Sequence, residues 1–342
     1  MRLVQAHKGF LIVVFVALAL VPVLANPYYV FIGNMMMLFI ILAVGLNLLI
    51  GYSGQLALAN AAMFGIGAYG CGVLQVTLGF PFWISAPFGA LLAMTIGTAI
   101  ALPALRLSGI YLALLTLAFA MIVHWVLLHW NSVTYGAGGF QTPRLDLSPL
   151  PIGSRTGTYY LSLIVAMVMV GFAWRLVRSR IGRAFVAIRD GEVAAQALGI
   201  NLVKYKVLAF ALSGFYAGAA GALYVPLLGY LAPEGFDLFQ MIIQKSMVVV
   251  GGMGSVLGSV IGAVVITIVL EVLRDVKDIQ EIFFGLILII FVLFRPKGLV
   301  SIFHLIPGWR EPLNSAGRQS PPPEVAGEPQ QPAADAVGGR DG

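Results

Sequence analysis

Long apolar segments recur along this chain, separated by short polar connections. An apolar run of about 18 residues can cross the roughly 30 Å hydrocarbon layer of a membrane as a helix. The composition agrees, since 60% of the 342 residues are hydrophobic and 10% are charged, against about 25% charged residues in soluble domains. The sequence therefore predicts an all-α, polytopic membrane helix bundle with about ten transmembrane helices. The predicted spans are 10–25, 29–50, 57–78, 83–104, 110–130, 158–177, 204–228, 237–252, 256–272 and 281–294.

The lysines and arginines are distributed unequally between the two sides of these spans. With the N-terminus in the cytoplasm, 15 of the 20 fall in cytoplasmic segments, four fall in outer loops and Lys245 lies within a span. This asymmetry follows the positive-inside rule and predicts that both termini are cytoplasmic. Arg2 and Lys8 before the first apolar segment are also typical of a cleaved secretory signal, but an uncleaved first span fits the charge distribution better. Because the cations flank spans rather than forming one patch, the net charge of +6 does not indicate nucleic-acid binding.

The composition changes abruptly after Glu311. Residues 1–311 form the predicted transmembrane domain. Residues 312–342 are rich in proline and nearly devoid of large apolar side chains, so they cannot bury enough surface to offset the entropy of ordering. We expect a disordered cytoplasmic tail there.

Several chemical signatures are absent from the sequence. It holds no G-x-x-x-x-G-K-[ST] phosphate loop, so the chain does not bind ATP by that route. The single cysteine, Cys71, excludes a cysteine cluster for metal, and no carboxylate pair or Ser/His/Asp arrangement suits hydrolysis. The acidic residues lie in loops, at span ends or in the tail, apart from Glu271 at the outer end of the ninth span, which disfavours proton coupling. Sodium coupling through backbone carbonyls stays open.

A short polar segment, AIRDGEVAAQALGIN at 187–201, lies between two predicted spans. The preceding RLVRSRIGR carries four arginines, which place the segment on the cytoplasmic side. Gly191 interrupts the chain, Glu192 suits a helix N-terminus and Gly199 suits a helix end. The sequence therefore predicts a short helix outside the bilayer. Docking into a partner protein and an ordinary solvated helix both fit this pattern.

Five motifs occur in one order along the chain: NLLIGYSGQLALANAAMFGIGAYG from Asn47, RLSGIYLALLTLAFA from Arg106, GRAFVAIRDGEVAAQALGINLVKYKVLAF from Gly182, MVVVGGMGSVLGSVIGA from Met247 and RPKGLV from Arg295. With them the chain resembles the permease subunits of ABC importers of the branched-chain amino acid (LivM/LivH) family, and LivM more than LivH. The resemblance covers about residues 29–300. It implies the permease fold of ABC importers and a multi-pass protein of the bacterial inner membrane.

The resemblance also implies a coupling loop at about 178–203, whose short helix sits in a cleft of an ATPase subunit. Two small alanines of this helix would permit close seating, and two arginines could meet acidic residues of the ATPase. The implied partners are two ATPase subunits that carry ATP and Mg²⁺, a homologous permease subunit and a periplasmic substrate-binding protein. This chain itself is expected to bind no cofactor and no metal. The implied coupling residues are Arg183, Arg189, Glu192, Ala194, Ala195 and Gly199.

Two spans are followed by glycine-rich interruptions, GYSGQLALAN after the second and GGMGS after the eighth. Backbone that is broken at membrane depth is tolerated only against protein or a water-filled cavity, and such breaks point to a transport site. Ordinary cytoplasmic turns are the alternative. The family usually has Gly-His where this chain has Ala59 and Asn60, which leaves the ligand assignment there open. The candidate residues of the substrate path are Asn47, Ser53, Gln55 and Asn60.

Lys245 is a cation about 13 Å inside a predicted span, counted at the helical rise per residue. It could attract a substrate carboxylate, or it could line the bundle beside Gln240 and Gln244. The resemblance implies import of branched-chain or other small amino acids by alternating access. Import of urea or short amides by the same architecture, and an ATP-independent carrier or channel, are the alternatives.

Glycines recur at helical spacing on three predicted spans. Such small residues let helix backbones approach closely where lipid offers no hydrophobic driving force, so they predict tight packing within the bundle. They are Gly65, Gly67, Gly70 and Gly72, then Gly214, Gly218 and Gly221, and finally Gly258 and Gly262.

Overall fold

The computed structural model describes residues 22, 26–107, 109–145, 153–274, 280–294 and 298–299. The first predicted span, 10–25, lies outside the described residues except for Pro22. The predicted tail at 312–342 lies wholly outside them.

Six helices of the described chain are long and apolar enough to cross a membrane, and each coincides with a predicted span. Three shorter apolar helices occupy the positions of the last three predicted spans. The six long helices are α2 (Pro27–Asn47), α3 (Asn60–Leu78), α4 (Phe82–Ala104), α5 (Ile110–His129), α7 (Ser154–Arg178) and α10 (Leu202–Leu228). The shorter ones are α11 (Leu238–Gly251), α12 (Val256–Val272) and α13 (Gln280–Phe294).

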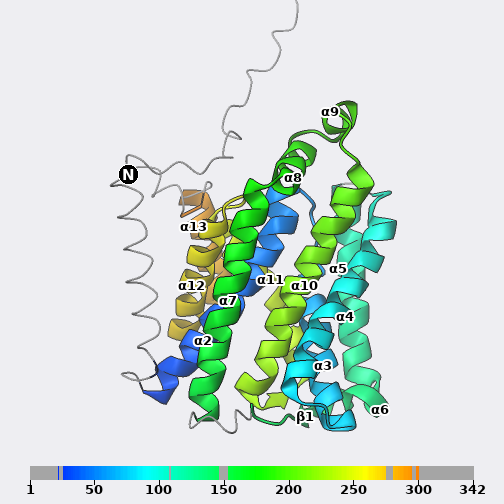
Figure 1. The fold of residues 1–342 in the computed structure, drawn as a ribbon. Coiled ribbons are helices and arrows are strands. Elements are labelled where there is room, and N and C mark those ends of the chain that lie inside the picture. Colours follow the sequence, from blue (N-terminus) through cyan, green and yellow to red (C-terminus); the bar gives the residue numbers. More distant parts are fainter. Residues whose placement is uncertain are drawn as a thin grey trace, which may run out of the picture. The chain divides into compact units, whose positions relative to one another are not determined.

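The remaining elements are short and lie between these helices (Figure 1). A π-helical turn, η1 (Leu48–Tyr52), extends α2, and the helices α8 (Arg180–Asp190) and α9 (Glu192–Ala197) join α7 to α10. In the part of the chain that is described, β1 (Phe140–Gln141) and β2 (Tyr230–Leu231) pair in antiparallel fashion, with Phe140 opposite Leu231. The other short elements are α6 (Asn131–Thr134), η2 (Gly136–Gly138) and η3 (Pro233–Phe236).

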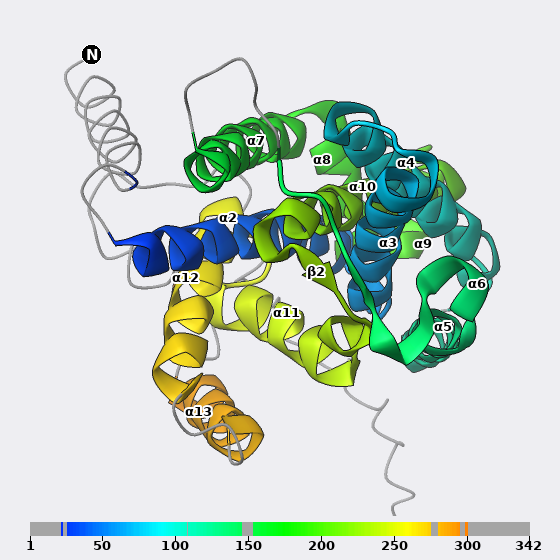
Figure 2. The same cartoon turned by 90° about the horizontal axis from the view of Figure 1, so that it is seen from below.

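Helix α10 lies at the centre of the bundle, among α2, α3, α4 and α7 (Figure 2). Its glycines make this possible. A Cβ at Gly67 of α3 would lie 2.3 Å from the Cα of Gly218, and one at Gly221 would lie 2.2 Å from the carbonyl oxygen of Phe64. Between α11 and α12, a Cβ at Gly262 would lie 1.9 Å from the carbonyl oxygen of Met247. The predicted close packing of helix backbones is confirmed at these positions.

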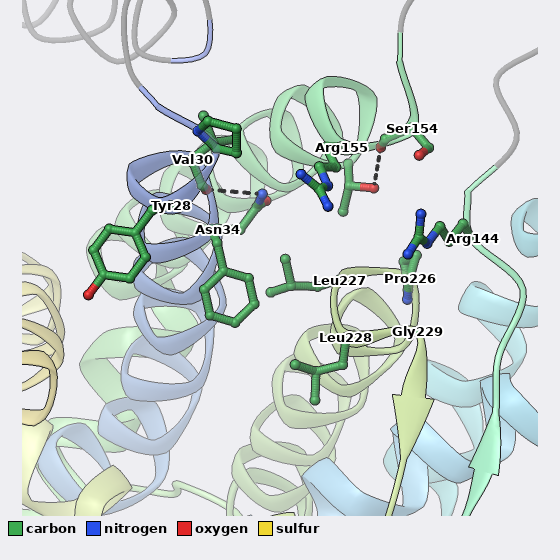
Figure 3. Close-up of a pocket in the computed structure, with 13 residues that line it drawn as sticks. Tyr28, Val30, Asn34, Arg144, Ser154, Arg155, Pro226, Leu227, Leu228 and Gly229 are labelled. Atoms are coloured by element: carbon green, nitrogen blue, oxygen red, sulfur yellow. Dashed lines mark hydrogen bonds between the residues drawn. The ribbon is translucent and has the colours of Figure 1, made fainter. Parts of the chain in front are cut away.

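The bundle has two distinct ends. Helices α8 and α9 lie at one end, and the β1–β2 pair lies at the other, beside the first residues of α2 (Figure 1). We call these the α9 end and the β end. At the β end, a pocket of about 340 Å³ lies between the start of α2, the start of α7 and the end of α10 (Figure 3).

Candidate functional site

The α9 end is built from two helices with a sharp change of direction between them. The Ser179 hydroxyl accepts a hydrogen bond from the backbone N–H of Ile181 at 3.1 Å and so caps the start of α8. Gly191 separates α8 from α9. Helix α9 begins at Glu192, and Gly199 just beyond its end has a φ of 81°, the left-handed conformation that favours glycine. The predicted short helix is therefore present.

Helix α9 exposes apolar side chains although it lies outside the long helices. Val193 is 84% exposed and Leu198 is 79% exposed. Ala194 is exposed beside them, whereas Ala195 is only 2% exposed and packs against the rest of the chain. Of the two alanines singled out in the sequence, one thus faces outward and one faces inward.

The first residue of α9 is tied to the central helix. Glu192 Oε1 lies 2.6 Å from Lys206 Nζ, and the Lys206 side chain is only 9% exposed. The ion pair connects α9 to α10, the helix at the centre of the bundle. Lys206 is not predicted from the sequence, because it is one of many cations that flank a span. The sequence feature that could have indicated the pair is that Glu192 and Lys206 lie near each other in the polar region between two predicted spans.

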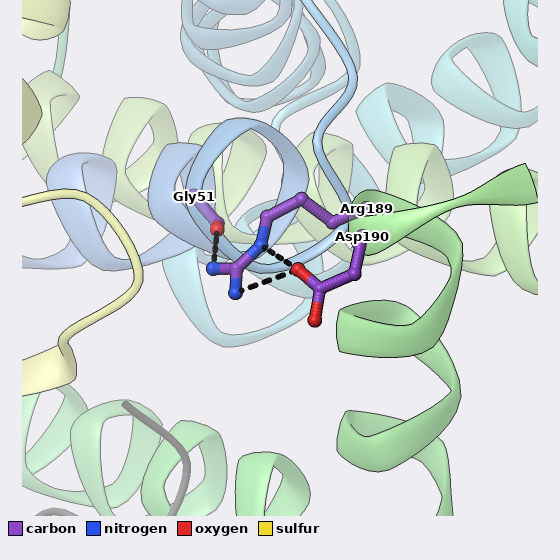
Figure 4. A network of polar contacts seen from close by, with 3 residues as sticks. All are labelled: Gly51, Arg189 and Asp190. Carbon is purple, nitrogen blue, oxygen red and sulfur yellow. Dashed lines mark hydrogen bonds and ion pairs between the residues drawn. The ribbon is translucent and has the colours of Figure 1, made fainter. Parts of the chain in front are cut away.

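Arg189 points into the protein. Its Nη1 donates to the carbonyl oxygen of Gly51 at 2.9 Å, and its Nε donates to Asp190 Oδ1 at 3.2 Å (Figure 4). Its side chain is 20% exposed. The guanidinium is therefore engaged within the chain, and the contact of Arg189 with acidic residues of a partner stays a prediction. Arg183, on the same helix, is exposed.

Both glycine-rich interruptions make room for Arg189. A Cβ at Gly54 would lie 2.7 Å from Arg189 Cγ, and one at Gly254 would lie 3.0 Å from Arg189 Nη1. Both glycines have positive φ, 71° and 77°. These two positions thus favour glycine for conformation and for space. Arg189 accordingly contacts the interruption after α2 and the one after α11.

Asn47 joins the same two interruptions from the other side. Its Nδ2 donates to the carbonyl oxygen of Ser255 and to Ser259 Oγ, both at 2.7 Å, and its Oδ1 accepts from the N–H of Gly254 at 2.9 Å. The side chain is 1% exposed. Its hydrogen bonds are thus made within the protein, so Asn47 holds the end of α2 against the start of α12.

The interruption after α2 alternates between buried and exposed residues. Residues 54–59 are non-helical; Gln55, Ala57 and Ala59 are buried, whereas Gly54 and Leu56 are exposed. The N–H of Leu58 donates to Thr116 Oγ1 of α5 at 2.9 Å. One side of this broken backbone thus packs against protein, which is a context in which a membrane protein tolerates it.

Asn60 lies in a buried polar cluster. Its Nδ2 donates to Gln244 Oε1 at 2.8 Å, and Ser213 Oγ donates to Asn60 Oδ1 at 3.3 Å. The three residues come from α3, α11 and α10, and Gln244 Nε2 is a buried donor without a partner in the described part of the chain. Ser213 is not predicted from the sequence, because it resembles any other small residue on a glycine-rich span.

The other path candidates make no hydrogen bond to this cluster within the described part of the chain. Ser53 Oγ donates back to the Leu49 carbonyl oxygen at 2.8 Å. Gln55 is 5% exposed, and its Nε2 has no partner among the described residues. Lys245 is half-buried and has no hydrogen bond or ion pair within the described residues. Consecutive residues of a helix point in different directions, so its neighbour Gln244 does not bring Lys245 to Asn60.

The described residues contain no group of three or more histidine, cysteine, aspartate or glutamate side chains that could hold a metal ion. The Asn60 cluster instead consists of amides and a hydroxyl. Such groups can bind a polar solute by hydrogen bonds.

Comparison with known proteins adds independent information. The family model described as "Branched-chain amino acid transport system / permease component" matches residues 28–293. The high-affinity branched-chain amino acid transport system permease protein LivM of Escherichia coli is 31% identical over 321 residues, which are 86% of this chain and 75% of that protein. The LivM protein of Salmonella typhimurium is equally similar, 31% over 320 residues. The ribose import permease protein RbsC of Haemophilus influenzae is 26% identical over 65% of this chain and 66% of its own length. No solved structure matches the chain.

Proposed function

Because this chain belongs to the branched-chain amino acid transport permease family of ABC importers, we propose that it imports branched-chain or other small amino acids, driven by ATP hydrolysis in partner subunits. As a member of that family it is a multi-pass protein of the inner membrane. Alternating access is the mechanism that we propose for the transport step.

The exposed apolar surface of α9 is the observation that carries this proposal. Val193 lies on this short helix, Leu198 directly follows its last residue, and both are more than three-quarters exposed. Large apolar side chains that are this exposed outside the membrane-crossing helices are typical of a protein interface. The ion pair between Glu192 and Lys206 holds this surface on α10. We infer that α9 sits in a groove of an ATPase subunit.

The proposed complex divides the work among its subunits. The sequence holds no phosphate loop, so ATP and Mg²⁺ would bind to two partner ATPase subunits. A homologous permease subunit would complete the transport path, and a periplasmic binding protein would deliver the substrate. The nature of the relatives supports these partners, because the named LivM proteins are permease components of transport systems.

The proposed topology has about ten spans, with both termini and the α9 end in the cytoplasm. Residues 1–311 would form the permease domain, with the coupling loop at about 178–203, and residues 312–342 would form a cytoplasmic tail. The buried Cys71 is the chain's single cysteine, which makes labelling straightforward. A Val193→Cys variant should react with an impermeant thiol reagent only from the cytoplasmic side. Labelling from the periplasmic side would contradict this topology.

We propose that Arg189 transmits the movement of the coupling loop to the membrane-embedded part. Its guanidinium binds the Gly51 carbonyl, and its side chain contacts Gly54 and Gly254, which belong to the two helix interruptions. Asn47 fastens these interruptions to each other. A displacement of α8 would therefore reach both interruptions together rather than one alone.

The proposed substrate path passes the Asn60 cluster. Unpaired amide donors of Gln55 and Gln244 support a path that binds polar groups, since a buried donor without a partner costs about 1–3 kcal/mol. Lys245 would attract the substrate carboxylate after a change of conformation. A Lys245→Met variant should then raise the KM for leucine uptake, and an unchanged KM would remove Lys245 from the path.

Reconstitution in liposomes tests the proposed function. The complete complex should take up radiolabelled leucine only with ATP, and the purified chain alone should take up none. The double variant Val193→Ala/Leu198→Ala should reduce both ATPase binding and uptake about tenfold or more. Ile110→Ala is the matched control, because Ile110 is also 68% exposed but lies on α5. Leucine uptake by the chain alone would refute the proposal.

A further inference from the structure

The pocket at the β end has the size and composition of a ligand site. Its volume of about 340 Å³ lies within the range of small-molecule sites in proteins, roughly 300–1,000 Å³. It is lined by residues from three helices and from the segment that follows β1, so no single element forms it. It lies at the opposite end of the bundle from α9 and Arg189, and none of the proposed coupling or path residues lines it.

Two guanidinium groups give the pocket its charge. Arg144 and Arg155 both line it, and Figure 3 shows the Arg155 side chain between α2 and α10 and the Arg144 side chain beside Pro226 at the end of α10. Neither arginine has a carboxylate within ion-pair distance among the described residues. Paired arginines favour planar or tetrahedral anions, because each guanidinium can donate two parallel hydrogen bonds to a carboxylate or phosphate.

Asn34 supplies an independent signal. Its side chain is 2% exposed and lines the pocket. Its Nδ2 donates to the Val30 carbonyl oxygen at 3.3 Å, whereas its Oδ1 is buried without a partner in the described part of the chain. A buried acceptor without a partner costs about 1–3 kcal/mol, so a ligand that donates a hydrogen bond there would be favoured.

The rest of the lining is apolar. Val30 and Phe31 of α2 line it together with Leu227 and Leu228 of α10. A ligand that fits all of these walls combines an anionic group, a hydrogen-bond donor and an apolar part. Inorganic anions lack the apolar part, so they do not match these walls.

We propose that this pocket binds an amphipathic anion whose carboxylate or phosphate lies between Arg144 and Arg155, while a donor group of the ligand binds Asn34 Oδ1. Two sources carry this chemistry. One is an aliphatic amino acid, with its carboxylate and ammonium groups, and the other is a phospholipid with a donor in its headgroup. Only the amino acid source rests on the proposed function, because a lipid would bind whether or not the protein transports amino acids.

Binding measurements on the full chain, purified with its partner subunits, test the proposal. Native mass spectrometry would report co-purified phosphatidylglycerol and phosphatidylethanolamine, and equilibrium dialysis of delipidated protein in dodecyl maltoside would report radiolabelled leucine. The variant Arg144→Gln/Arg155→Gln should lower one of these two occupancies about tenfold. The control Arg106→Gln/Arg175→Gln removes the same charge from two exposed arginines outside the pocket and should lower neither.

Asn34→Leu provides the second variant, because leucine branches at Cγ as asparagine does and replaces the unpaired acceptor with a methyl group. It should lower the same occupancy about threefold. Loss of phospholipid alone identifies a lipid site, and loss of leucine binding alone identifies a solute site. Equal occupancy of both ligands in the arginine variant and its control would overturn the proposal, whatever the outcome of the transport assays.

Discussion

Helices α2 and α12 are joined by polar side chains near both of their ends, and the two junctions differ in burial. At the α9 end, Asn47 is 1% exposed and forms three hydrogen bonds to the start of α12. At the β end, Tyr28 donates to Glu271, which also pairs with Arg274 at 3.1 Å. The Arg274 guanidinium lies 5.3 Å from the Tyr28 ring, but its side chain is 54% exposed.

The difference shows which end of the helix pair is fixed. A buried amide that loses its partners costs the full desolvation of each group left behind, whereas an exposed ion pair competes with water and salt. The contact between α2 and α12 should therefore be more stable at the α9 end than at the β end. The expected effect of a substitution should decrease as the exposure of the replaced side chain increases, from Asn47 through Arg189 and Glu192 to Arg274.

Asn47→Leu should have the largest effect. It removes the hydrogen bonds that Asn47 makes to the Gly254 N–H and the Ser255 carbonyl, at a side chain that is 1% exposed. We expect a loss of about 2–4 kcal/mol in stability, seen as a fall of roughly 5 °C or more in the thermal midpoint in detergent. Asn34→Leu is the matched control on the same helix, because Asn34 makes a hydrogen bond only within α2. Equal thermal midpoints for the two variants would show that the hydrogen bonds of Asn47 do not stabilise the contact between α2 and α12.

Arg189→Gln should have the next largest effect, and its effect should fall on transport more than on folding. The shorter side chain cannot reach the Gly51 carbonyl, so α8 would lose its contact with both helix interruptions. We expect leucine uptake to fall about tenfold, which corresponds to about 1.4 kcal/mol. ATP hydrolysis by the complex should persist, because α9 still presents Val193 and Leu198.

Arg183→Gln serves as the control for this prediction, since Arg183 lies on the same helix and is exposed. It should change uptake less than twofold. A parallel loss of uptake and ATP hydrolysis in Arg189→Gln would show that the arginine supports ATPase docking instead of transmission.

Glu192→Gln should have an intermediate effect, because Glu192 is half-exposed while its partner Lys206 is largely buried. We expect a loss of about 0.5–1 kcal/mol after allowing for solvent screening. Hydrogen exchange at the backbone of α9 should become faster, because this ion pair holds α9 to α10. A double-mutant cycle with Lys206→Gln would isolate the pair, and a coupling energy of zero would remove its anchoring role.

The long helices were predictable from the sequence, because a membrane requires long apolar runs whichever helices pack beside them. Helix α9 was also predictable, since Gly191, Glu192 and Gly199 are local signals for its start and end. The inward direction of Arg189 was not. A cation next to the membrane suggests a partner-facing role, and the receiving carbonyl of Gly51 lies 138 residues away along the chain.

Asn47 illustrates the same limit for the substrate path. A polar residue beside a helix interruption reads as a ligand from sequence, but its partners Gly254, Ser255 and Ser259 lie more than 200 residues away. Pairings of that range depend on how the helices pack and leave no local periodicity. The glycines at 54 and 254 were the usable signal, because their missing Cβ atoms leave the space that the Arg189 side chain fills.

Arg274→Gln should have the smallest effect, about 0.5 kcal/mol or less, because the Arg274 side chain is more than half exposed and water replaces much of its ion pair. This small effect should itself vanish in 1 M NaCl, where charges are screened within roughly 3 Å. The effect of Asn47→Leu should not depend on salt, because buried neutral amides have no charge to screen. Thermal midpoints of both variants at low and high salt would measure this contrast. If Arg274→Gln lowered the thermal midpoint as much as Asn47→Leu does, and independently of salt, the contact between α2 and α12 would be equally stable at both ends. The proposed difference between the two ends would then be wrong.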